Sequence, residues 1–282
     1  MKIALIGGSS FIGQILIGHL LKKGLRITAT YNNNSNIKNK IKKITWKSLD
    51  FSKKKNYFKY LNSPDVVINL SWPDIPHYHT KKHLETYKFQ KGFNENLVKN
   101  GLKNLIITGT CYEYGKVNGE ISENKLAKPV VTYGVAKLRL LKSILKLQKT
   151  YKFNFTWLRP FYVYGKNKKR KTLFSLINTP KIIDQTLSVK GSLVRDFIPV
   201  EFLCKIIVKI VIKNKDIGIL NVCSGKGISI KKFILKNIKN KKNLKKIKMN
   251  GENPNNFEPN YFWGNADKLK KVLSLRKSFF KF

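Results

Sequence analysis

A glycine-rich turn between a short apolar run and a helical pattern constrains the fold of this chain more than any other feature. Lys2–Ile6 fits a buried parallel strand, and Phe11–Lys23 carries the apolar stripe of a helix. In a strand–turn–helix unit, free N–H groups and the helix dipole converge on one point, which suits a pyrophosphate. The residues expected to bind a cofactor there are Gly7, Ser9, Ser10, Phe11, Ile12 and Gly13.

The turn departs from the usual glycine pattern at one position. Gly7, Ser10 and Gly13 fit G-x-x-G-x-x-G except that Ser10 replaces the middle glycine. A side chain there stands where the backbone should approach the phosphates, which weakens the signal. Taken alone, the motif is also compatible with an ordinary glycine turn.

Strand-like runs alternate with helix-like stretches through about residue 165. This alternation predicts an α/β fold, a Rossmann-type doubly wound parallel sheet with a smaller C-terminal substrate-binding domain. We expect residues 1–165 to form the NAD(P)-binding domain, residues 195–224 to return to its sheet, and residues 166–282 to form the smaller, partly interleaved domain. The expected strands are Arg26–Tyr31, Val66–Leu70, Leu105–Thr108 and Phe155–Leu158, and the expected crossover helices are Leu84–Asn100 and Tyr133–Thr150.

Tyr133 and Lys137 have the spacing Y-x-x-x-K, which places both side chains on one face of a helix. A nearby ammonium should lower the pKa of the phenol towards neutrality. Such a tyrosine gives a proton to a carbonyl oxygen or takes one from an alcohol. The spacing alone is weak evidence, but it gains weight from the upstream Thr110 and the glycine turn.

The net charge of +42 would attract polyanions. The basic residues are mostly Lys, however, and occur with abundant Asn and Ile, which is typical of an AT-rich genome. A nucleic-acid site would need Arg and aromatic residues interleaved on one surface. We therefore do not expect nucleic acid as a partner, and RNA binding on the same fold is kept as a remote alternative.

Other sequence features predict a cytoplasmic protein without a metal. No stretch approaches the roughly 20 apolar residues of a membrane span, and the first strand lacks the form of a signal peptide. Three cysteines without metal-type spacing indicate a reducing compartment. His77, His79 and His83 lie close in sequence, but no Cys or carboxylate cluster accompanies them.

Seven blocks in the chain resemble an extended short-chain dehydrogenase/reductase of the NAD-dependent epimerase/dehydratase family. The resemblance covers nearly the whole chain, and the blocks follow in the family's order. They are Gly7–Gly13, Asp65–Ser71, Thr108–Gly115, Tyr133–Lys137, Leu158–Gly165, Arg195–Val200 and Asn221–Gly225.

The resemblance implies a role for individual residues. Thr110 corresponds to the residue that hydrogen-bonds the reacting oxygen, Tyr133 to the general acid/base, and Lys137 to the lysine that binds the nicotinamide ribose. Asp50 stands where the family binds the adenine amino group, with a surface carboxylate as the alternative. Arg195 stands where an arginine clamps the substrate diphosphate, with a salt bridge to the adjacent aspartate as the alternative. The remaining implied contacts are Asn32, Leu70, Ser71 and Pro160 for the cofactor, and Tyr112 and Tyr162 for the substrate.

Departures from the family pattern narrow the reaction. Dehydratases of the family carry Asp-Glu after the Ser/Thr, where this chain has Cys111 and Tyr112. Glu113 is one place too late, and alternation along a strand would turn it the other way. A 4,6-dehydratase is therefore disfavoured. The 4-epimerases often have Asn where Tyr162 stands, which makes that activity the second choice.

Four segments together resemble the branch of nucleotide-linked 4-keto-6-deoxysugar reductases of the dTDP-fucose and CDP-abequose synthase type. They are Ser71–Tyr78, His83–Glu85, Thr108–Gly115 and Glu258–Gly264. The resemblance implies NAD(P)H-dependent reduction of the C4 ketone of a nucleotide sugar, for surface polysaccharide synthesis. The alternative is a nucleotide-sugar 4-epimerase with tightly bound NAD. Thr30–Asn34 contains no acid, which favours NADP over NAD. The family also implies a homodimer formed through the two crossover helices.

Overall fold

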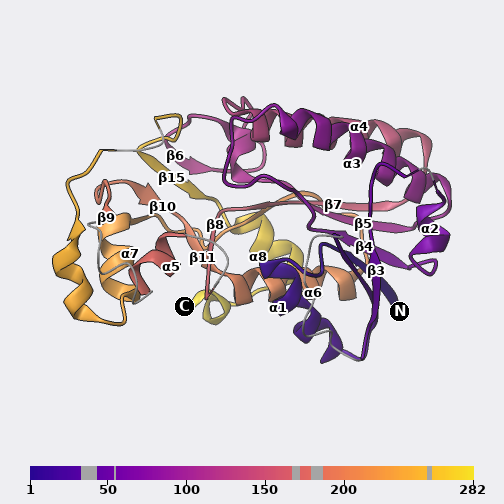
Figure 1. The fold of residues 1–282 in the computed structure, drawn as a ribbon, viewed down its shortest axis with the longest axis horizontal. Coiled ribbons are helices and arrows are strands. Elements are labelled where there is room, and N and C mark those ends of the chain that lie inside the picture. Colours follow the sequence, from indigo (N-terminus) through magenta and orange to yellow (C-terminus); the bar gives the residue numbers. More distant parts are fainter. Residues whose placement is uncertain (33–42, 54, 167–171, 179–186, 253–255) are drawn as a thin grey trace.

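The computed structural model describes residues 1–32, 43–53, 55–166, 172–178, 187–252 and 256–282. Within these ranges the centre is a seven-stranded sheet in the order β12-β7-β5-β4-β1-β2-β3, with every neighbouring pair parallel (Figure 1). Its strands are β1 (Lys2–Ile6), β2 (Arg26–Tyr31), β3 (Thr45–Ser48), β4 (Val66–Asn69), β5 (Asn104–Thr108), β7 (Asn154–Pro160) and β12 (Gly218–Val222). The predicted doubly wound parallel sheet is confirmed.

Helices cover both faces of this sheet. On one side lie α3 (Lys82–Lys99) and α4 (Thr132–Thr150), and on the other α1 (Phe11–Leu21), α6 (Val200–Lys213) and α8 (Asp267–Leu273) (Figure 1). Side chains of a strand alternate between the two faces. Ile3 and Leu5 of β1 accordingly join the core under α1 and α6. Ala4 and Ile6 join the core under α3 and α4.

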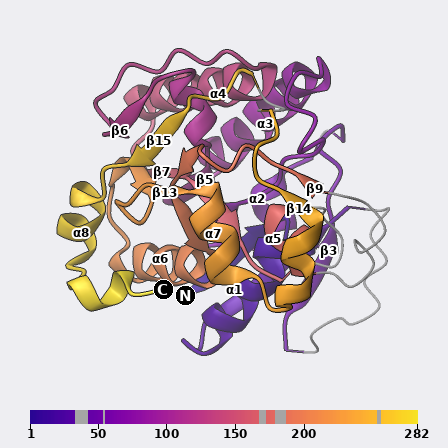
Figure 2. The same ribbon diagram turned by 90° about the vertical axis from the view of Figure 1, so that its left-hand side faces the viewer.

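Smaller sheets and short helices form the region at one end of the molecule, which Figure 2 views end-on. A four-stranded sheet has the order β13-β10-β15-β6, and two further pairs are β8 with β11 and β9 with β14. The strands of these three smaller sheets are β6 (Gly119–Ile121), β8 (Tyr162–Tyr164), β9 (Leu187–Ser188), β10 (Val194–Arg195), β11 (Phe197–Pro199), β13 (Ile228–Ser229), β14 (Ile247–Lys248) and β15 (Tyr261–Gly264). The short helices of this region are α5 (Leu173–Asn178), α7 (Ile230–Asn237) and the 3-10 turn Lys241–Lys246. The helix α2 (Tyr57–Tyr60) lies at the opposite end beside α3 (Figure 1), and the 3-10 turns Cys111–Tyr114 and Lys277–Phe280 pack against α4 and α6.

The expected return of residues 195–224 to the main sheet needs a correction in its first part. β12 is the edge strand of that sheet, but β10 and β11 lie in the smaller sheets. Phe197 stacks on Phe233 of α7 with ring centroids 3.8 Å apart. The Asp196 carboxylate accepts backbone N–H groups of Ser224 and Gly264. These contacts draw the segment towards the C-terminal part of the chain.

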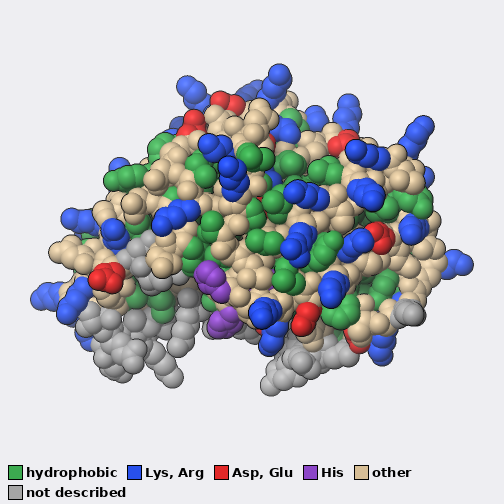
Figure 3. Space-filling model, turned by 90° about the horizontal axis from the view of Figure 1, so that it is seen from above, with side chains coloured by type: hydrophobic (Ala, Val, Ile, Leu, Met, Phe, Trp, Pro, Cys, Tyr) green, Lys and Arg blue, Asp and Glu red, His purple; other side chains and the backbone are tan. Residues whose placement is uncertain are grey.

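The basic side chains are dispersed over the face that α3 and α4 form (Figure 3). Figure 3 shows Lys and Arg spread across the α3–α4 face, with hydrophobic and polar side chains between them. This spacing differs from the continuous basic stripe of a nucleic-acid site. No helix in the described ranges is both long and apolar enough to cross a lipid bilayer.

Candidate active site

The turn after β1 brings two glycines into close backbone contact. Gly7 adopts φ +83°, and its N–H donates to Thr30 Oγ1 at 3.0 Å. A Cβ on Gly13 would lie 2.3 Å from the Gly7 carbonyl oxygen. A side chain would therefore be strained at Gly7 and would collide at Gly13. This tight cradle at the start of α1 fits the pyrophosphate of a dinucleotide.

Ser10 is the N-cap of α1. Its Oγ accepts the N–H of Gly13 at 3.1 Å, and its own N–H donates to the Gly7 carbonyl at 3.0 Å. The side chain is thus turned towards the first turn of the helix. Serine is among the preferred residues at this position, because its oxygen satisfies an otherwise free N–H group. The departure from glycine therefore has a local structural reason.

Other cofactor candidates lie where neighbouring strands end. Leu70 and Ser71 follow β4, and Pro160 is the last residue of β7. Ser71 N donates to Asn69 Oδ1 at 3.1 Å, and a Cβ on Gly7 would lie only 3.3 Å from Ser71 N. The carboxyl ends of parallel strands share one edge of the sheet, which is where ligands of such sheets bind.

The adenine end of the candidate cofactor site lies at β2 and β3. Asp50 accepts hydrogen bonds from Ser52 N at 2.9 Å and Ser52 Oγ at 2.7 Å. These two bonds lower the pKa of the Asp50 carboxyl, which is consequently ionised at neutral pH. Asn32 directly follows β2. Asn33 and Asn34, which also entered the choice between NADP and NAD, lie outside the described residues.

Thr110, Tyr133 and Lys137 meet above the end of β5. Thr110 is the N-cap of the 3-10 turn Cys111–Tyr114, and the other two residues lie in the first turns of α4. Thr110 and Tyr133 are joined by a side-chain hydrogen bond. Tyr133 N donates to the Tyr78 carbonyl at 2.9 Å, which fixes the start of α4. The structure thus brings the three predicted catalytic residues together.

The expectation that the pKa of Tyr133 is lowered is wrong in this structure. Burial raises the pKa of Tyr133, and the hydrogen bond from Thr110 offsets only part of that rise. Lys137 is also buried, which lowers its pKa to about 7. Its Nζ donates to the Thr108 carbonyl at 2.6 Å. With a pKa of about 7, Lys137 is only partly charged at neutral pH, which weakens its effect on the pKa of Tyr133.

Trp72 and His83 form a supporting pair that sequence reasoning missed. Lys137 Nζ lies 3.9 Å from the centroid of a Trp72 ring. Trp72 Nε1 donates to His83 Nδ1 at 3.1 Å, and His83 Nε2 lies 3.0 Å from the carbonyl oxygen of His77. Burial lowers the pKa of His83, so the ring is neutral and orients the indole. The described residues contain no group of three or more His, Cys, Asp or Glu side chains that could hold a metal.

Glu113 lies in the 3-10 turn Cys111–Tyr114, so the expected alternation along a strand does not apply to it. Its carboxylate accepts Thr110 N at 2.8 Å, Trp157 Nε1 at 3.0 Å and Arg159 Nε at 2.8 Å. The side chain is fully buried. Burial raises the pKa of Glu113, and Arg159 opposes that rise. All these contacts are structural, so Glu113 is not placed as a base for the site.

The substrate candidates Tyr112, Tyr162 and Arg195 gather around Glu258. Arg195 Nη2 and Nε donate to Glu258 Oε2 at 2.8 and 3.2 Å. The Tyr112 hydroxyl donates to Glu258 Oε1. The Tyr162 ring centroid lies 5.4 Å from Arg195 Cζ. Burial, reinforced by nearby negative charge, raises the pKa of both tyrosines. Sequence reasoning missed Glu258 as the centre of this group.

The alternative pairing of Arg195 with Asp196 is wrong. The partner of Arg195 is Glu258. Asp196 instead accepts backbone N–H groups of Ser224 at 2.8 Å and Gly225 at 3.1 Å. Burial raises the pKa of Asp196 to about 6. Neighbouring residues of an extended segment point in opposite directions, which separates the two charges.

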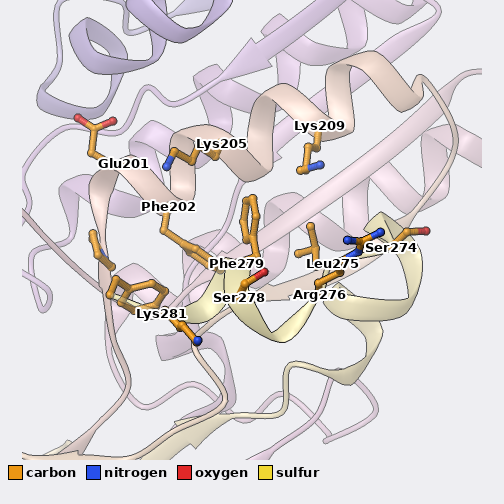
Figure 4. Close-up of a pocket in the computed structure, with 12 residues that line it drawn as sticks. Glu201, Phe202, Lys205, Lys209, Ser274, Leu275, Arg276, Ser278, Phe279 and Lys281 are labelled. Carbon is orange, nitrogen blue, oxygen red and sulfur yellow. The ribbon is translucent and has the colours of Figure 1, made fainter.

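A separate cavity of about 580 Å³ lies between α6 and the C-terminal segment (Figure 4). Phe202 and Phe279 contribute aromatic walls, and Lys205, Lys209 and Lys281 contribute positive charge. Its lining includes none of the predicted site residues. In a chain with 57 Lys and Arg residues, cations beside a surface cavity do not by themselves indicate a ligand.

Residues 3–223 match the model of the NAD dependent epimerase/dehydratase family. The chain belongs to this family. A relative, dTDP-6-deoxy-L-talose 4-dehydrogenase (NAD(+)) of Aggregatibacter actinomycetemcomitans, is 23% identical over 236 residues, which is 82% of this chain and 87% of the relative. Membership confirms the predicted Rossmann-type, NAD(P)-dependent enzyme.

Two similar solved structures support the fold. UDP-N-acetylglucosamine 4-epimerase from Methanobrevibacter ruminantium M1 superposes with a TM-score of 0.82 at 18% identity, covering 98% of this chain and 92% of that one. UDP-glucuronic acid 4-epimerase from Bacillus cereus, in complex with UDP-glucuronic acid and NAD, gives 0.80 at 22% identity, covering 98% and 94%.

Proposed function

We propose that this family member uses NAD(P)H to reduce the C4 ketone of a nucleotide-activated 4-keto-6-deoxyhexose. The observation that carries the proposal is the joined group of Thr110, Tyr133 and Lys137 at the carboxyl edge of the sheet. The Tyr133 phenol carries its proton at neutral pH and can therefore donate it, although the raised pKa makes it a weaker acid. The talose dehydrogenase relative, whose name describes a 6-deoxysugar and position 4, supports the substrate class.

In the proposed reaction, Thr110, Tyr133 and Lys137 each have a separate role. Bound NAD(P)H supplies the hydride that C4 receives. Thr110 hydrogen-bonds the carbonyl oxygen, and Tyr133 gives that oxygen its proton as the alcohol forms. Lys137, with a pKa lowered to about 7, gains a proton readily at neutral pH, and its charge then offsets that of the Tyr133 phenolate. The burial of Tyr133, which is 6% exposed, keeps water from the reacting oxygen.

The residues of the glycine turn, Asp50, Leu70, Ser71 and Pro160 would hold the cofactor. The non-acidic Asn32 after β2 supports NADP, because no negative charge there repels a 2′-phosphate. The talose dehydrogenase is named for NAD(+), and the UDP-glucuronic acid 4-epimerase structure contains NAD, which supports NAD instead. The ratio of kcat/KM for NADPH and NADH distinguishes them.

The test is loss of reduced nicotinamide absorbance with dTDP-4-keto-6-deoxyglucose. We expect turnover by the native protein and a loss of at least about a hundredfold in Tyr133→Phe, which removes the proton donor. Tyr151→Phe, at the other end of α4, is the matched control and should keep full activity. A folded protein that binds cofactor but consumes none with any 4-keto-6-deoxysugar nucleotide would contradict the proposal.

A nucleotide-sugar 4-epimerase is the second candidate. The two 4-epimerases with similar folds support it, and the same Tyr133 and Lys137 can take a proton from a C4 hydroxyl and return it. This activity predicts NAD that remains bound through purification and no net use of NADPH. Those two observations separate the candidates in the same preparation.

We further propose a cytoplasmic homodimer that serves surface polysaccharide synthesis. The α3–α4 face carries Phe89 and Leu145 as exposed apolar side chains, 47% and 38% accessible, which an interface would cover. The three cysteines are buried and free, which is compatible with a reducing compartment. A molar mass in solution equal to that of one chain would contradict the dimer.

A further inference from the structure

The Arg195 guanidinium is already engaged on each of its nitrogens. Nε and Nη2 donate to the Glu258 carboxylate, and Nη1 donates to the carbonyls of Val194 at 2.8 Å and Asn260 at 3.3 Å. The Arg195 side chain is only 1% exposed. The Glu258 carboxylate therefore occupies the position beside Arg195 where a bound anion would lie.

Glu258 is the partner with freedom to leave. It lies in a bend outside any helix or strand, and its side chain is 7% exposed. The backbone after it is fixed, because Val194 N donates to the Asn260 carbonyl at 2.9 Å. Rotation of the Glu258 side chain towards solvent would leave that backbone contact in place.

We infer that Glu258 is a built-in competitor for the anionic part of the substrate, and that a nucleoside diphosphate binds Arg195 by displacing it. The inference rests on the proposed function and assigns a specificity role within the same site. A diphosphate carries at least two negative charges against the single charge of the carboxylate, so it has the stronger attraction to Arg195. An uncharged sugar cannot displace Glu258 in this way.

Displacement of Glu258 would also change the hydrogen bonding beside the proton donor, Tyr133. Glu258 accepts the Tyr112 hydroxyl, and the Tyr112 ring centroid lies 6.4 Å from that of Tyr133. When Glu258 leaves, the Tyr112 hydroxyl becomes available to the sugar beside Tyr133. Recognition of the diphosphate at Arg195 is thereby linked to the hydrogen bonding of the ketosugar.

The experiment measures the dissociation constants of UDP and dTDP by titration calorimetry, without any turnover. Glu258→Gln keeps the shape of the side chain but removes the competing charge, so we expect the better of the two nucleotides to bind at least about tenfold more tightly, which is about 1.4 kcal/mol. Glu252→Gln is the matched control, because Glu252 is an exposed acid in the same segment. It makes the same change in net charge and should alter affinity less than about twofold.

Equal or weaker binding by folded Glu258→Gln would overturn the inference, as would no binding by either protein. If Glu258→Gln does not fold, Tyr112→Phe serves instead, because it removes one of the hydrogen bonds that hold Glu258. Its affinity should rise by about threefold, and an unchanged affinity counts against the inference. Tighter binding without reduction of any ketosugar would defeat only the proposed reaction. Reduction without tighter binding would defeat only the role of Glu258.

Discussion

Two buried Arg–Glu pairs flank the 3-10 turn Cys111–Tyr114, and they differ in how completely they are held. Both have an N–O distance of 2.8 Å. Glu113 is fully buried and also accepts Trp157 Nε1 and the Thr110 backbone N–H, so three donors surround it with Arg159 included. Glu258 is 7% exposed, and its further partners among the described residues are the side chains of Tyr112 and Tyr162, with no backbone N–H among them. The first pair builds the scaffold, and the second leaves an exchangeable contact.

The largest effect that tests this comparison is on folding stability. Glu113→Gln leaves Arg159 as an uncompensated buried charge, so we expect the free energy of unfolding to fall by about 3–5 kcal/mol. Glu258→Gln should cost less than half as much, because water reaches the rim of the second pair. Urea unfolding measures both. Glu95→Gln is the control, because it alters an exposed ion pair in which Lys91 Nζ lies 3.8 Å from Glu95 Oε1. It should change the free energy of unfolding little. Equal losses for Glu113 and Glu258 would remove the distinction.

A smaller effect concerns Asp196, a buried carboxylate with no ion pair among the described residues. Burial raises its pKa from 3.8 to about 6, so the folded protein holds the proton more tightly than the unfolded chain. Its contribution is therefore fully present below about pH 4 and is lost as the pH rises through about 6. We expect the free energy of unfolding to decline by about 2–3 kcal/mol across that range.

Urea unfolding at several pH values measures this slope. Asp196→Asn removes the titrating group and should make the free energy of unfolding fall less steeply with pH. The fall due to Glu113 should remain, because burial also raises the pKa of Glu113. An identical slope in the two proteins would show that Asp196 contributes nothing to it.

Local patterns predicted most of the fold, and they singled out the three residues that the structure brings together as the candidate catalytic group. The glycine turn, the alternating runs and the spacing of Tyr133 and Lys137 depend on neighbours in sequence, and all produced the expected elements. β3, Thr45–Ser48, was not predicted, because a four-residue strand with polar side chains lacks a distinctive pattern.

Features that depend on contacts between distant parts of the chain could not be predicted from local sequence patterns. Glu258 lies 63 residues from Arg195, and no periodicity links a loop carboxylate to a strand arginine. The stacking of Trp72 over Lys137 likewise joins residues of different elements. The pKa of Tyr133 was predicted in the wrong direction because its sign depends on burial, which the spacing of two residues does not reveal.

The alternation along β1 has a mechanical consequence. Ile3 and Leu5 belong to one core, and Ala4 and Ile6 to the other. No backbone movement can withdraw the first pair without disturbing the second. We therefore expect the helical layers above and below the sheet to unfold together, and the glycine turn that follows Ile6 to be held from both faces of the sheet.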